Sequence, residues 1–331
     1  MTTRVAINGL GRIGRAALKT ILETPELQLV AANDLIPADG LAYLLNYDTV
    51  YGRYDKKVQV TDGGLDIGGK EYKLFSEKDP ASLPWKELDV ELVFECTGIF
   101  RKSEDLKKHL EAGAKKVILS APAKSDDIPS VVHGVNQAPD DAQIISCASC
   151  TTNCITPVSE VLDRHLGIKK AVMTTIHAYT ASQDIVDTYQ KKTRRGRAAA
   201  ANLVPTTTGA AQATTKVLTN LKNRFDGVAV RCPVPTGSLS DLVYLVEKET
   251  TVDEVNEIFR KESETDKYKN VLGVTNDPIV SSDIVRDPRG SLVDLGMTQV
   301  VDGDLIKIMA WYDNEWGYTN QMIREAIRIS A

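Results

Sequence analysis

The chain has 331 residues, of which 42% are hydrophobic and 26% charged, and its formal net charge is −5. These values are typical of a globular enzyme with two domains, and the acidic balance argues against a protein whose main partner is nucleic acid. The sequence has no signal-peptide pattern at its start and no apolar run long enough to span a membrane. The five cysteines, three of them crowded together, do not form a disulfide-framework pattern. Free thiols fit a reducing compartment, so we expect a cytoplasmic location.

The first stretch predicts a dinucleotide site. An apolar strand at Arg4–Asn8 leads directly into Gly-Leu-Gly-Arg-Ile-Gly at residues 9–14, and a helical pattern follows. The glycines let the backbone approach a pyrophosphate, which the helix N-terminus also favours, and Arg12 is a side chain that the pyrophosphate could use. A second strand, Leu27–Ala32, leads to Asp34, near the expected spacing of ~20 residues for a carboxylate that binds the ribose hydroxyls. A loop or helix-cap role is the alternative for Asp34, but a carboxylate here repels the extra phosphate of NADP, so the sequence predicts NAD.

Strands and helices alternate through the rest of the first half. Strands are expected at Val90–Glu95 and Lys116–Leu119, with a helix at Ser103–Ala112 whose first residue is the expected N-cap. This alternation predicts a doubly wound, mostly parallel sheet. Ligands of such sheets bind beyond the carboxyl ends of the strands, where Thr97 and Ser120 are expected.

The pattern changes after Cys150. A helix is expected at Thr151–His165, followed by a strand at Lys169–Ile176 and a polar, functional loop over residues 178–201. The later segments predict a mostly antiparallel sheet covered on one face by helices. The expected strands are Val228–Pro233, Leu239–Glu247, Ser291–Gln299 and Leu305–Tyr312, and the expected helices are Ala211–Asn220 and Val252–Glu264.

We therefore expect an α/β fold with an α+β second domain. Residues 1–149 form an NAD-binding Rossmann domain, onto which the C-terminal helix 315–331 packs. Residues 150–314, with the loop 178–201, form the catalytic domain.

Three cysteines lie close together at Cys147, Cys150 and Cys154. A metal or iron–sulfur site is one interpretation, but no fourth ligand lies nearby, and we expect no metal. Buried packing is the ordinary role of free cysteines and is expected for Cys147 and Cys154. Cys150 is expected where a strand turns into a helix, and the helix N-terminus lowers a thiol pKa and favours the reactive thiolate.

A nucleophilic cysteine needs a histidine elsewhere in the chain. His109 and His165 are expected to be solvated, whereas His177 ends an apolar strand, with a bland core histidine as the alternative. A Cys150–His177 pair with a nicotinamide cofactor indicates aldehyde oxidation through a thiohemiacetal and a thioester, with the histidine as base. Several donors after the nucleophile suit phosphate oxygens, although part of the arginine cluster 194–197 is expected to be only solvated. These donors are Thr180, Arg197, Thr208, Gly209 and Arg231, and the residues that flank the nucleophile, Ser149 and Thr151, can add to them.

The whole chain resembles the phosphorylating glyceraldehyde-3-phosphate dehydrogenase family. The resemblance rests on motifs at residues 8–14, 148–153, 175–180, 194–200, 205–211 and 311–318, of which Ala-Ser-Cys-Thr-Thr-Asn is the most specific. It implies glyceraldehyde 3-phosphate, inorganic phosphate and NAD as reactants, 1,3-bisphosphoglycerate as product, a place in glycolysis or gluconeogenesis, and a homotetramer.

The resemblance also implies residue roles. Cys150 is the nucleophile and His177 its base. Thr180 and Arg231 match the substrate-phosphate pocket. The inorganic-phosphate pocket matches Ser149, Thr151, Thr208 and Gly209, with Arg197 in the anion sites; the cofactor residues are Gly9, Gly11, Arg12, Ile13, Gly14, Asp34, Lys78, Thr97, Ser120, Asn314 and Tyr318.

Several positions depart from the family pattern. Leu10 stands in place of Phe, and Gly196 in place of Ala, which is expected to loosen the loop. Thr188-Tyr189 replaces the Leu-Pro pair typical of strictly NAD-dependent members, which leaves NADP use open. The segment that begins at Cys232 also differs, so the surroundings of Arg231 can differ too.

Two other functions compete with this one. An erythrose-4-phosphate dehydrogenase releases its thioester to water, but the segment Thr206–Ala211 retains the inorganic-phosphate pocket. A catalytically silent NAD-binding or RNA-binding protein is the alternative from another class, and the intact Cys150/His177 pair argues against it.

Overall fold

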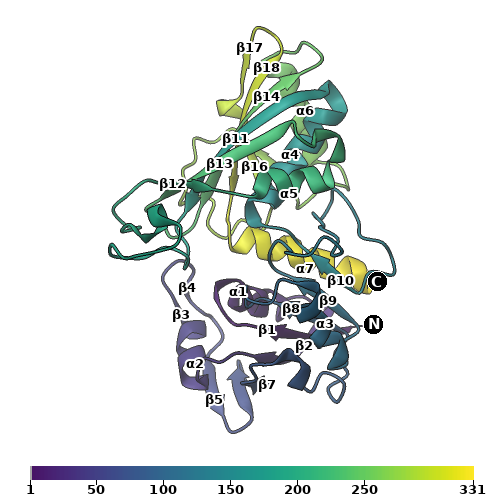
Figure 1. Ribbon diagram of the computed structural model, residues 1–331, viewed down its shortest axis with the longest axis vertical. Coiled ribbons are helices and arrows are strands. Elements are labelled where there is room, and N and C mark those ends of the chain that lie inside the picture. The colour runs from purple at the N-terminus through teal and green to yellow at the C-terminus, as the bar shows by residue number, and fades with distance from the viewer. Residues whose placement is uncertain (1) are drawn as a thin grey trace. The chain divides into compact units, whose positions relative to one another are not determined.

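The computed structural model describes residues 2–331, which divide into two compact units (Figure 1). The first unit contains the chain as far as Val131, the segment Gln137–Ala148 and the C-terminal residues Met322–Ala331. The second contains Val132–Asn136 and Ser149–Gln321. Among residues 2–331, no helix combines the length and the apolar character needed to cross a membrane.

The first unit is built on an eight-stranded sheet with the order β10-β9-β8-β1-β2-β7-β6-β5. Its strands are β1 (Thr3–Asn8), β2 (Leu27–Asn33), β5 (Val58–Thr61), β6 (Gly64–Ile67), β7 (Lys70–Phe75), β8 (Leu92–Glu95), β9 (Lys116–Leu119) and β10 (Ile144–Ser146). The run from β7 to β10 is parallel, and only β5 and β6 add an antiparallel edge. The parallel order is that of a doubly wound dinucleotide-binding sheet, as predicted.

Buried strands explain why this half of the sequence has continuous apolar runs. Every residue of β8 is buried, as are the last four of β1, because helices cover such a sheet on both faces. The helices are α1 (Arg12–Ile21), α2 (Ala38–Asn46), α3 (Ser103–Glu111) and the short η1 (Pro80–Ser82), and β3 (Tyr47–Asp48) pairs with β4 (Gly52–Arg53). The N-cap of α3 is Lys102, one residue before the expected Ser103, whose hydroxyl donates instead to Asp127 (2.7 Å).

The second unit contains a mostly antiparallel sheet with the order β12-β13-β11-β14-β18-β16-β15, and β17 pairs with β18. The strands are β11 (Ile168–Ala178), β12 (Val204–Thr207), β13 (Phe225–Cys232), β14 (Ser238–Val246), β15 (Leu272–Thr275), β16 (Ser291–Asp294), β17 (Gln299–Val301) and β18 (Leu305–Tyr312). Alternate residues of β14 and β18 are buried, which is the pattern of a sheet with one covered face. The expected strand Ser291–Gln299 is divided into β16 and β17 by a short helical turn.

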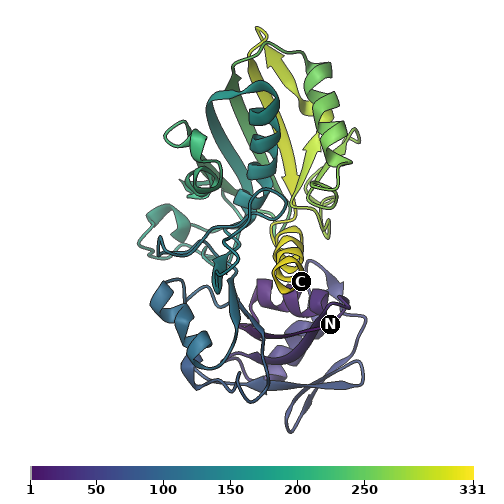
Figure 2. The same ribbon diagram turned by 90° about the vertical axis from the view of Figure 1, so that its right-hand side faces the viewer.

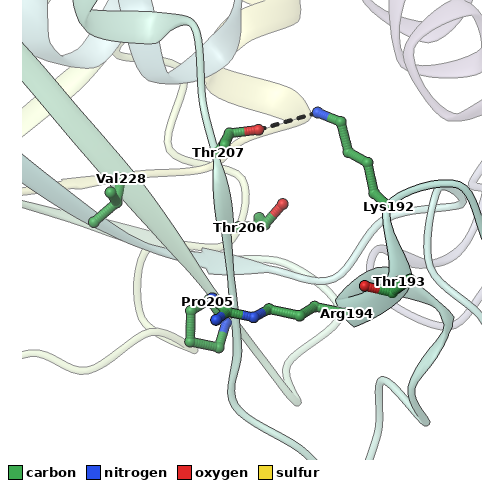
Figure 3. A pocket seen from close by; sticks show the side chains of 7 residues that line it. All are labelled: Lys192, Thr193, Arg194, Pro205, Thr206, Thr207 and Val228. Atoms are coloured by element: carbon green, nitrogen blue, oxygen red, sulfur yellow. Dashed lines mark hydrogen bonds between the residues drawn. The ribbon is translucent and has the colours of Figure 1, made fainter.

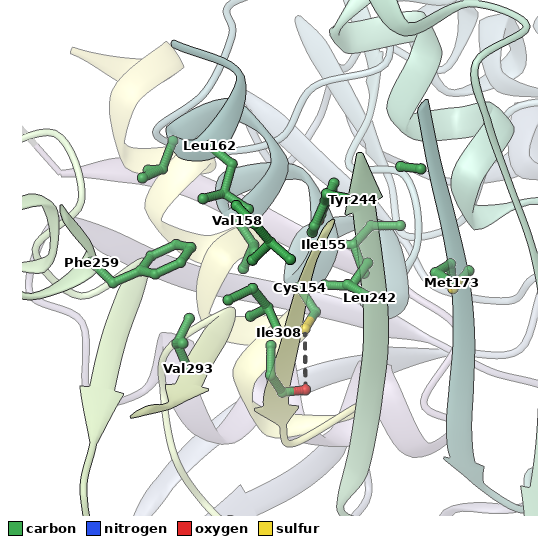
Figure 4. Packing of buried hydrophobic residues seen from close by; sticks show 14 of the residues in the cluster. Cys154, Ile155, Val158, Leu162, Met173, Leu242, Tyr244, Phe259, Val293 and Ile308 are labelled. Atoms are coloured by element: carbon green, nitrogen blue, oxygen red, sulfur yellow. Dashed lines mark hydrogen bonds between the residues drawn. The ribbon is translucent and has the colours of Figure 1, made fainter. Parts of the chain in front are cut away.

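Helices cover the buried face of this sheet (Figure 2). They are α4 (Cys150–Leu166), α5 (Ala210–Val217) and α6 (Val252–Ser263), with short turns η2 (Thr193–Gly196), η3 (Thr219–Leu221) and η4 (Leu295–Met297), and α7 (Trp316–Ser330) ends the chain. Figure 4 shows Val158 and Leu162 of α4 packed with Leu242 and Ile308 from the sheet. Cys154 lies in this core, as expected for a packing cysteine, and its thiol donates to the carbonyl of Ala310 (3.7 Å).

Candidate active site

Cys150 is the first residue of α4, at the strand-to-helix turn that the sequence predicts. The turn follows β10, and Ala148 within it has a positive φ of 53°. Ser149 caps the helix, since its hydroxyl accepts a hydrogen bond from the Thr152 N–H (3.1 Å). Cys150 therefore lies in the first turn, where backbone N–H groups lack partners within the helix.

The strand β11 brings His177 to this cysteine. It continues through Ala178, beyond the expected end at Ile176, so His177 lies inside the strand and is opposite Arg231 on the parallel strand β13. The His177 Nε2 atom is 3.4 Å from the Cys150 Sγ atom. The structure thus brings together the two side chains that the sequence analysis paired.

Tyr312 supports this pair and was not singled out from the sequence. Its ring meets the His177 ring edge-on, with 6.0 Å between centroids. Its hydroxyl bonds the Thr151 hydroxyl (2.9 Å) and the Thr175 hydroxyl (2.8 Å). Tyr312 ends a predicted strand, but nothing in the spacing along the chain indicates that its hydroxyl links α4 with β11.

Arg231 occupies the other side of His177. Its Nη1 atom lies 2.5 Å from His177 Nδ1 and donates to the Ala178 carbonyl (2.8 Å), which itself is 2.7 Å from Nδ1. The buried Nε of Arg231 has no hydrogen-bond partner among residues 2–331. A guanidinium with an unused N–H group is a suitable ligand for an anion.

Burial and Arg231 set the protonation of the pair. Burial, followed by the charge of Arg231, lowers the pKa of His177 to about 3, so the free site holds a neutral imidazole. The pKa of Cys150 is raised by burial, which outweighs the opposing effects of Arg231 and Thr151. The helix N-terminus lowers this pKa, as expected from the sequence, through the backbone N–H groups of Cys150 and Thr151, but burial has the larger effect and leaves the pKa raised.

The predicted phosphate residues lie in three local groups. Thr180 bonds Ser182 through their hydroxyls (2.8 Å), next to β11. Gly209 is the N-cap residue of α5, whose start has no side-chain cap, and the Thr208 hydroxyl accepts from the Ala210 N–H (3.2 Å). Thr151 is buried, and its hydroxyl bonds the Tyr312 hydroxyl, as described above.

The arginines of the loop 178–201 differ in their partners. Arg197, which the sequence analysis selected, binds Asp187 (2.8 Å), and both side chains are mostly exposed. Arg195 donates to the hydroxyls of Thr206 (3.0 Å) and Ser182 (3.4 Å), and its charge contributes to the lowered pKa of His177. Sequence reasoning named the cluster but could not tell which arginine faces the site.

A cavity of about 430 Å³ lies beside this loop. Its wall joins η2 to the strand β12, and the Lys192 ammonium donates to the Thr207 hydroxyl across it (3.1 Å; Figure 3). The lining residues are Lys192, Thr193, Arg194, Pro205, Thr206, Thr207 and Val228. Lys192 and Arg194 make the cavity basic, and Thr206 and Thr207 in its wall directly precede the predicted phosphate residue Thr208.

Gly196 tightens the loop, contrary to the expected loosening. A Cβ atom at this position would lie 2.1 Å from the carbonyl oxygen of Thr188. The Thr188 N–H also donates to the Gly196 carbonyl (2.8 Å). The two departures from the family pattern are therefore in direct contact, and the glycine permits the close approach of their backbones.

The glycine turn of the first unit fits a dinucleotide. A Cβ at Gly14 would meet the Gly9 carbonyl at 1.8 Å, whereas a Cβ at Gly11 would meet nothing within 4 Å. No side chain caps the N-terminus of α1, so its N–H groups remain available to a pyrophosphate. Asp34 accepts from the N–H groups of Leu10 (2.5 Å) and Ile36 (2.8 Å), and a carboxylate retains further acceptor sites for ribose hydroxyls.

Other predicted cofactor residues have defined surroundings in their own units. Arg12 is paired with Asp48 and lies over the Tyr51 ring. Thr97 and Ser120 follow the carboxyl ends of β8 and β9, as expected. The remaining ones are Ile13 in α1, the exposed Lys78, the buried Tyr318, and Asn314, which accepts from the Ser238 hydroxyl (2.9 Å).

Residues 2–331 contain no cluster of His, Cys, Asp or Glu side chains that could hold a metal ion. A doubly wound dinucleotide-binding sheet, together with a Cys–His pair in a second unit, defines the class of NAD-dependent oxidoreductases that act on aldehydes.

Comparison with known proteins gives the family. Residues 3–103 match the family model "Glyceraldehyde 3-phosphate dehydrogenase, NAD binding domain", and residues 149–314 match the model of the C-terminal domain. The chain is 50% identical to glyceraldehyde-3-phosphate dehydrogenase of Streptomyces coelicolor over 98% of this chain and 97% of the relative. It is 46% identical to that of Geobacillus stearothermophilus over 100% and 99%, and 46% identical to glyceraldehyde-3-phosphate dehydrogenase 1 of Bacillus subtilis over the same shares. The chain belongs to the glyceraldehyde-3-phosphate dehydrogenase family, and NAD is its cofactor.

Proposed function

We propose that this glycolytic oxidoreductase converts glyceraldehyde 3-phosphate and inorganic phosphate to 1,3-bisphosphoglycerate, with Cys150 as nucleophile and His177 as base. The observation that carries the assignment is the 3.4 Å approach of Cys150 Sγ to His177 Nε2 at the start of α4. A nucleophile within hydrogen-bond reach of a base is the arrangement that covalent catalysis requires.

The first step forms a carbon–sulfur bond. His177 Nε2 takes the thiol proton, and the sulfur attacks the aldehyde carbon. The carbonyl oxygen gains the electron pair and then the proton held by His177, which gives a thiohemiacetal. Backbone N–H groups in the first turn of α4 stabilise the developing oxyanion.

The second step oxidises this adduct to a thioester. NAD, when bound, supplies the acceptor for the hydride that leaves the substrate carbon. His177 takes the hydroxyl proton as the carbon–oxygen double bond forms again. An oxygen of inorganic phosphate then attacks the thioester carbon, the carbon–sulfur bond breaks, and Cys150 is released as a thiolate.

Arg231 couples the substrate phosphate to the state of His177. The His177 Nδ1 atom lies 2.5 Å from the Arg231 guanidinium, from which it can only accept, and 2.7 Å from the Ala178 carbonyl, to which it can only donate, so the two contacts compete. A phosphate on Arg231 would neutralise its charge and draw it away from Nδ1. The Nδ1–H group could then donate to the Ala178 carbonyl, which leaves Nε2 free to accept the thiol proton.

The phosphate pockets follow from unused donors. Thr180 and Arg231 are assigned to the substrate phosphate, which the unpartnered Nε of Arg231 supports. The uncapped start of α5 supports an inorganic-phosphate pocket there. This pocket comprises Ser149, Thr151, Thr208 and Gly209, and its arginine is either Arg197, which the family resemblance implies, or Arg195, which bonds Thr206.

The dinucleotide is assigned to the glycine turn and Asp34 of the first unit, with Asn314 and Tyr318 for its nicotinamide end. The two hydrogen bonds that orient Asp34 support a preference for NAD. Use of NADP at a lower efficiency is included in the proposal, because Tyr189 is 87% exposed and Thr188 replaces an apolar residue of the family pattern.

A homotetramer in the cytoplasm is the proposed form of the enzyme. Exposed apolar side chains support self-association: Val172 and Val228 on the sheet are 59% and 52% exposed, and Leu203 and Val186 near the loop are 70% exposed each. The free state of all five cysteines supports a reducing compartment.

Steady-state kinetics test this function. Oxidation of glyceraldehyde 3-phosphate should depend on inorganic phosphate and proceed with a higher kcat/KM for NAD than for NADP. Phosphate-independent oxidation of erythrose 4-phosphate, faster than that of the triose, would overturn the assignment.

A further inference from the structure

A buried chain of polar side chains crosses the first unit. The Trp85 indole donates to His109 Nδ1 (3.1 Å), and His109 Nε2 lies 3.1 Å from a Glu95 oxygen. The Asn8 amide donates to the same carboxylate (2.6 Å), and the Asn33 amide donates to Asn8 (2.8 Å). Trp85, His109 and Glu95 are completely buried, which contradicts the expectation that His109 is solvated. The function described above uses neither Glu95 nor His109.

The donors and acceptors fix the direction of each bond. An indole N–H can only donate, so His109 Nδ1 accepts and the ring proton lies on Nε2, which donates to Glu95. Glu95 also accepts from the backbone N–H (2.8 Å) and the hydroxyl of Thr97. A carboxylate, which only accepts, satisfies all four donors at once.

This arrangement is costly for stability alone. A buried carboxylate needs compensation, and in residues 2–331 neither lysine nor arginine forms a hydrogen bond or ion pair with Glu95. Well-packed apolar residues of similar volume are often equally stable or more stable than a buried charged group. The network therefore indicates that the protein requires Glu95 and the strand ends around it to be held in fixed positions.

The network lies at the ends of three strands. Asn8 ends β1 just before Gly9, and Asn33 ends β2 just before Asp34. Glu95 ends β8 and holds Thr97. These three strand ends lead into the residues proposed to bind the dinucleotide.

The glycine turn rests directly on the segment that Glu95 holds. A Cβ at Gly9 would lie 2.7 Å from the Thr97 nitrogen. The Gly9 N–H donates to the Asn33 carbonyl (2.8 Å), so the turn is also tied to the strand that leads to Asp34. A shift of Glu95 would therefore change the spacing between the turn, Thr97 and the ribose carboxylate.

We propose that Glu95, oriented by His109, is a positioning residue for NAD. It fixes the distances between Gly9, Asp34 and Thr97 without touching the cofactor itself. The proposal rests on the proposed location of the dinucleotide at the glycine turn, and it does not depend on the roles of Cys150 and His177.

Two substitutions of His109 distinguish an effect on the position of Glu95 from an effect on the stability of the fold. In His109→Gln the amide nitrogen can replace Nε2 and donate to Glu95, while the bond to Trp85 is lost. In His109→Asn the amide oxygen can replace Nδ1 and accept from Trp85, while the bond to Glu95 is lost. Each variant loses one buried hydrogen bond, so both should unfold at similarly lowered temperatures.

The NAD dissociation constant, measured by calorimetry on the full-length enzyme, should separate the two variants. We expect His109→Asn to raise it about tenfold, the worth of one hydrogen bond to a charged group, and His109→Gln to stay within about twofold of the wild type. At saturating NAD, kcat and the KM for the triose phosphate should be unchanged in both. Equal effects of the two variants on NAD binding, or no effect of either, would overturn the proposal.

Two further variants keep the test decisive. If the His109 variants do not fold, Trp85→Phe removes the indole donor together with one of the two rings, and a rise of about threefold in the NAD dissociation constant is expected because the His109 proton is no longer fixed. No change in that variant would refute the positioning role. Asp34→Ala tests the location of the cofactor itself. Unchanged NAD binding in this variant would show that the proposed cofactor site is wrong. Weakened NAD binding in Asp34→Ala, together with wild-type NAD binding in His109→Asn, would refute the positioning role alone.

Discussion

Two buried histidines, one in each unit, have opposite surroundings. His109 is enclosed by an indole donor and a carboxylate acceptor. Its Nδ1 atom accepts from the indole, and its Nε2 atom donates to the carboxylate. His177 lies between a thiol and a guanidinium, and the guanidinium retains a buried N–H without a partner in the described chain. A network whose members are all satisfied is rigid, whereas a site with an unused donor and a displaced pKa is prepared to bind and react.

The strongest test of this contrast is Cys150→Ser. A hydroxyl is a far weaker nucleophile than a thiol, so we expect NAD-coupled turnover to fall by at least about 10³-fold. NAD binding by the glycine turn should remain within about twofold of the wild type, because Cys150 is not among the residues assigned to the dinucleotide. Turnover at the wild-type rate would show that the chemistry does not use this residue.

His177→Asn should have the next largest effect. The amide keeps a polar side chain in place but cannot take a proton, so kcat should fall by roughly 10²–10⁴-fold, the usual worth of general acid–base catalysis. The matched control is His109→Gln, which alters the other buried histidine and should leave kcat at saturating NAD unchanged. The role of His177 as base is wrong if its variant keeps the wild-type kcat.

Much of this contrast could be predicted from the sequence, and part of it could not. The glycine turn, the start of α4 at Cys150 and the strand that carries His177 are local patterns, since each depends on neighbours in the chain. The burial of His109 depends on Trp85 and Glu95, which lie 24 and 14 residues away, so its charged helix suggested solvent. The direction in which the helix N-terminus acts on the pKa of Cys150 could be predicted for the same local reason, whereas the larger opposing effect of burial could not.

Arg195 and Arg197 test which arginine of the loop 178–201 belongs to the reactive site. Arg195 bonds Thr206 and Ser182 and affects the pKa of His177, whereas Arg197 pairs with Asp187 at the surface. Arg195→Gln should raise the KM for phosphate about tenfold, and Arg197→Gln should change it by no more than about twofold, since an exposed ion pair contributes little. The same kinetic series on both variants decides between the two arginines, and a larger effect of Arg197→Gln would identify Arg197 as the phosphate ligand.

The pH dependence of stability gives the smallest expected effect and tests the lowered pKa of His177. Burial and Arg231 lower the pKa of His177 from 6.5 to about 3 in the folded chain. Between these two values the unfolded chain binds a proton that the folded chain does not, so stability rises with pH through this window and is lost as the pH falls from about 6.5 toward 3. The thermal midpoint of the wild type minus that of His177→Asn should therefore decrease between pH 7 and pH 5, by a few degrees at most, because each 1 kcal/mol is worth about 2–4 °C in a large domain. A difference that stays constant would mean that folding does not lower the pKa of His177, and one that grows on acidification would mean that folding raises it; either result would contradict the lowered pKa.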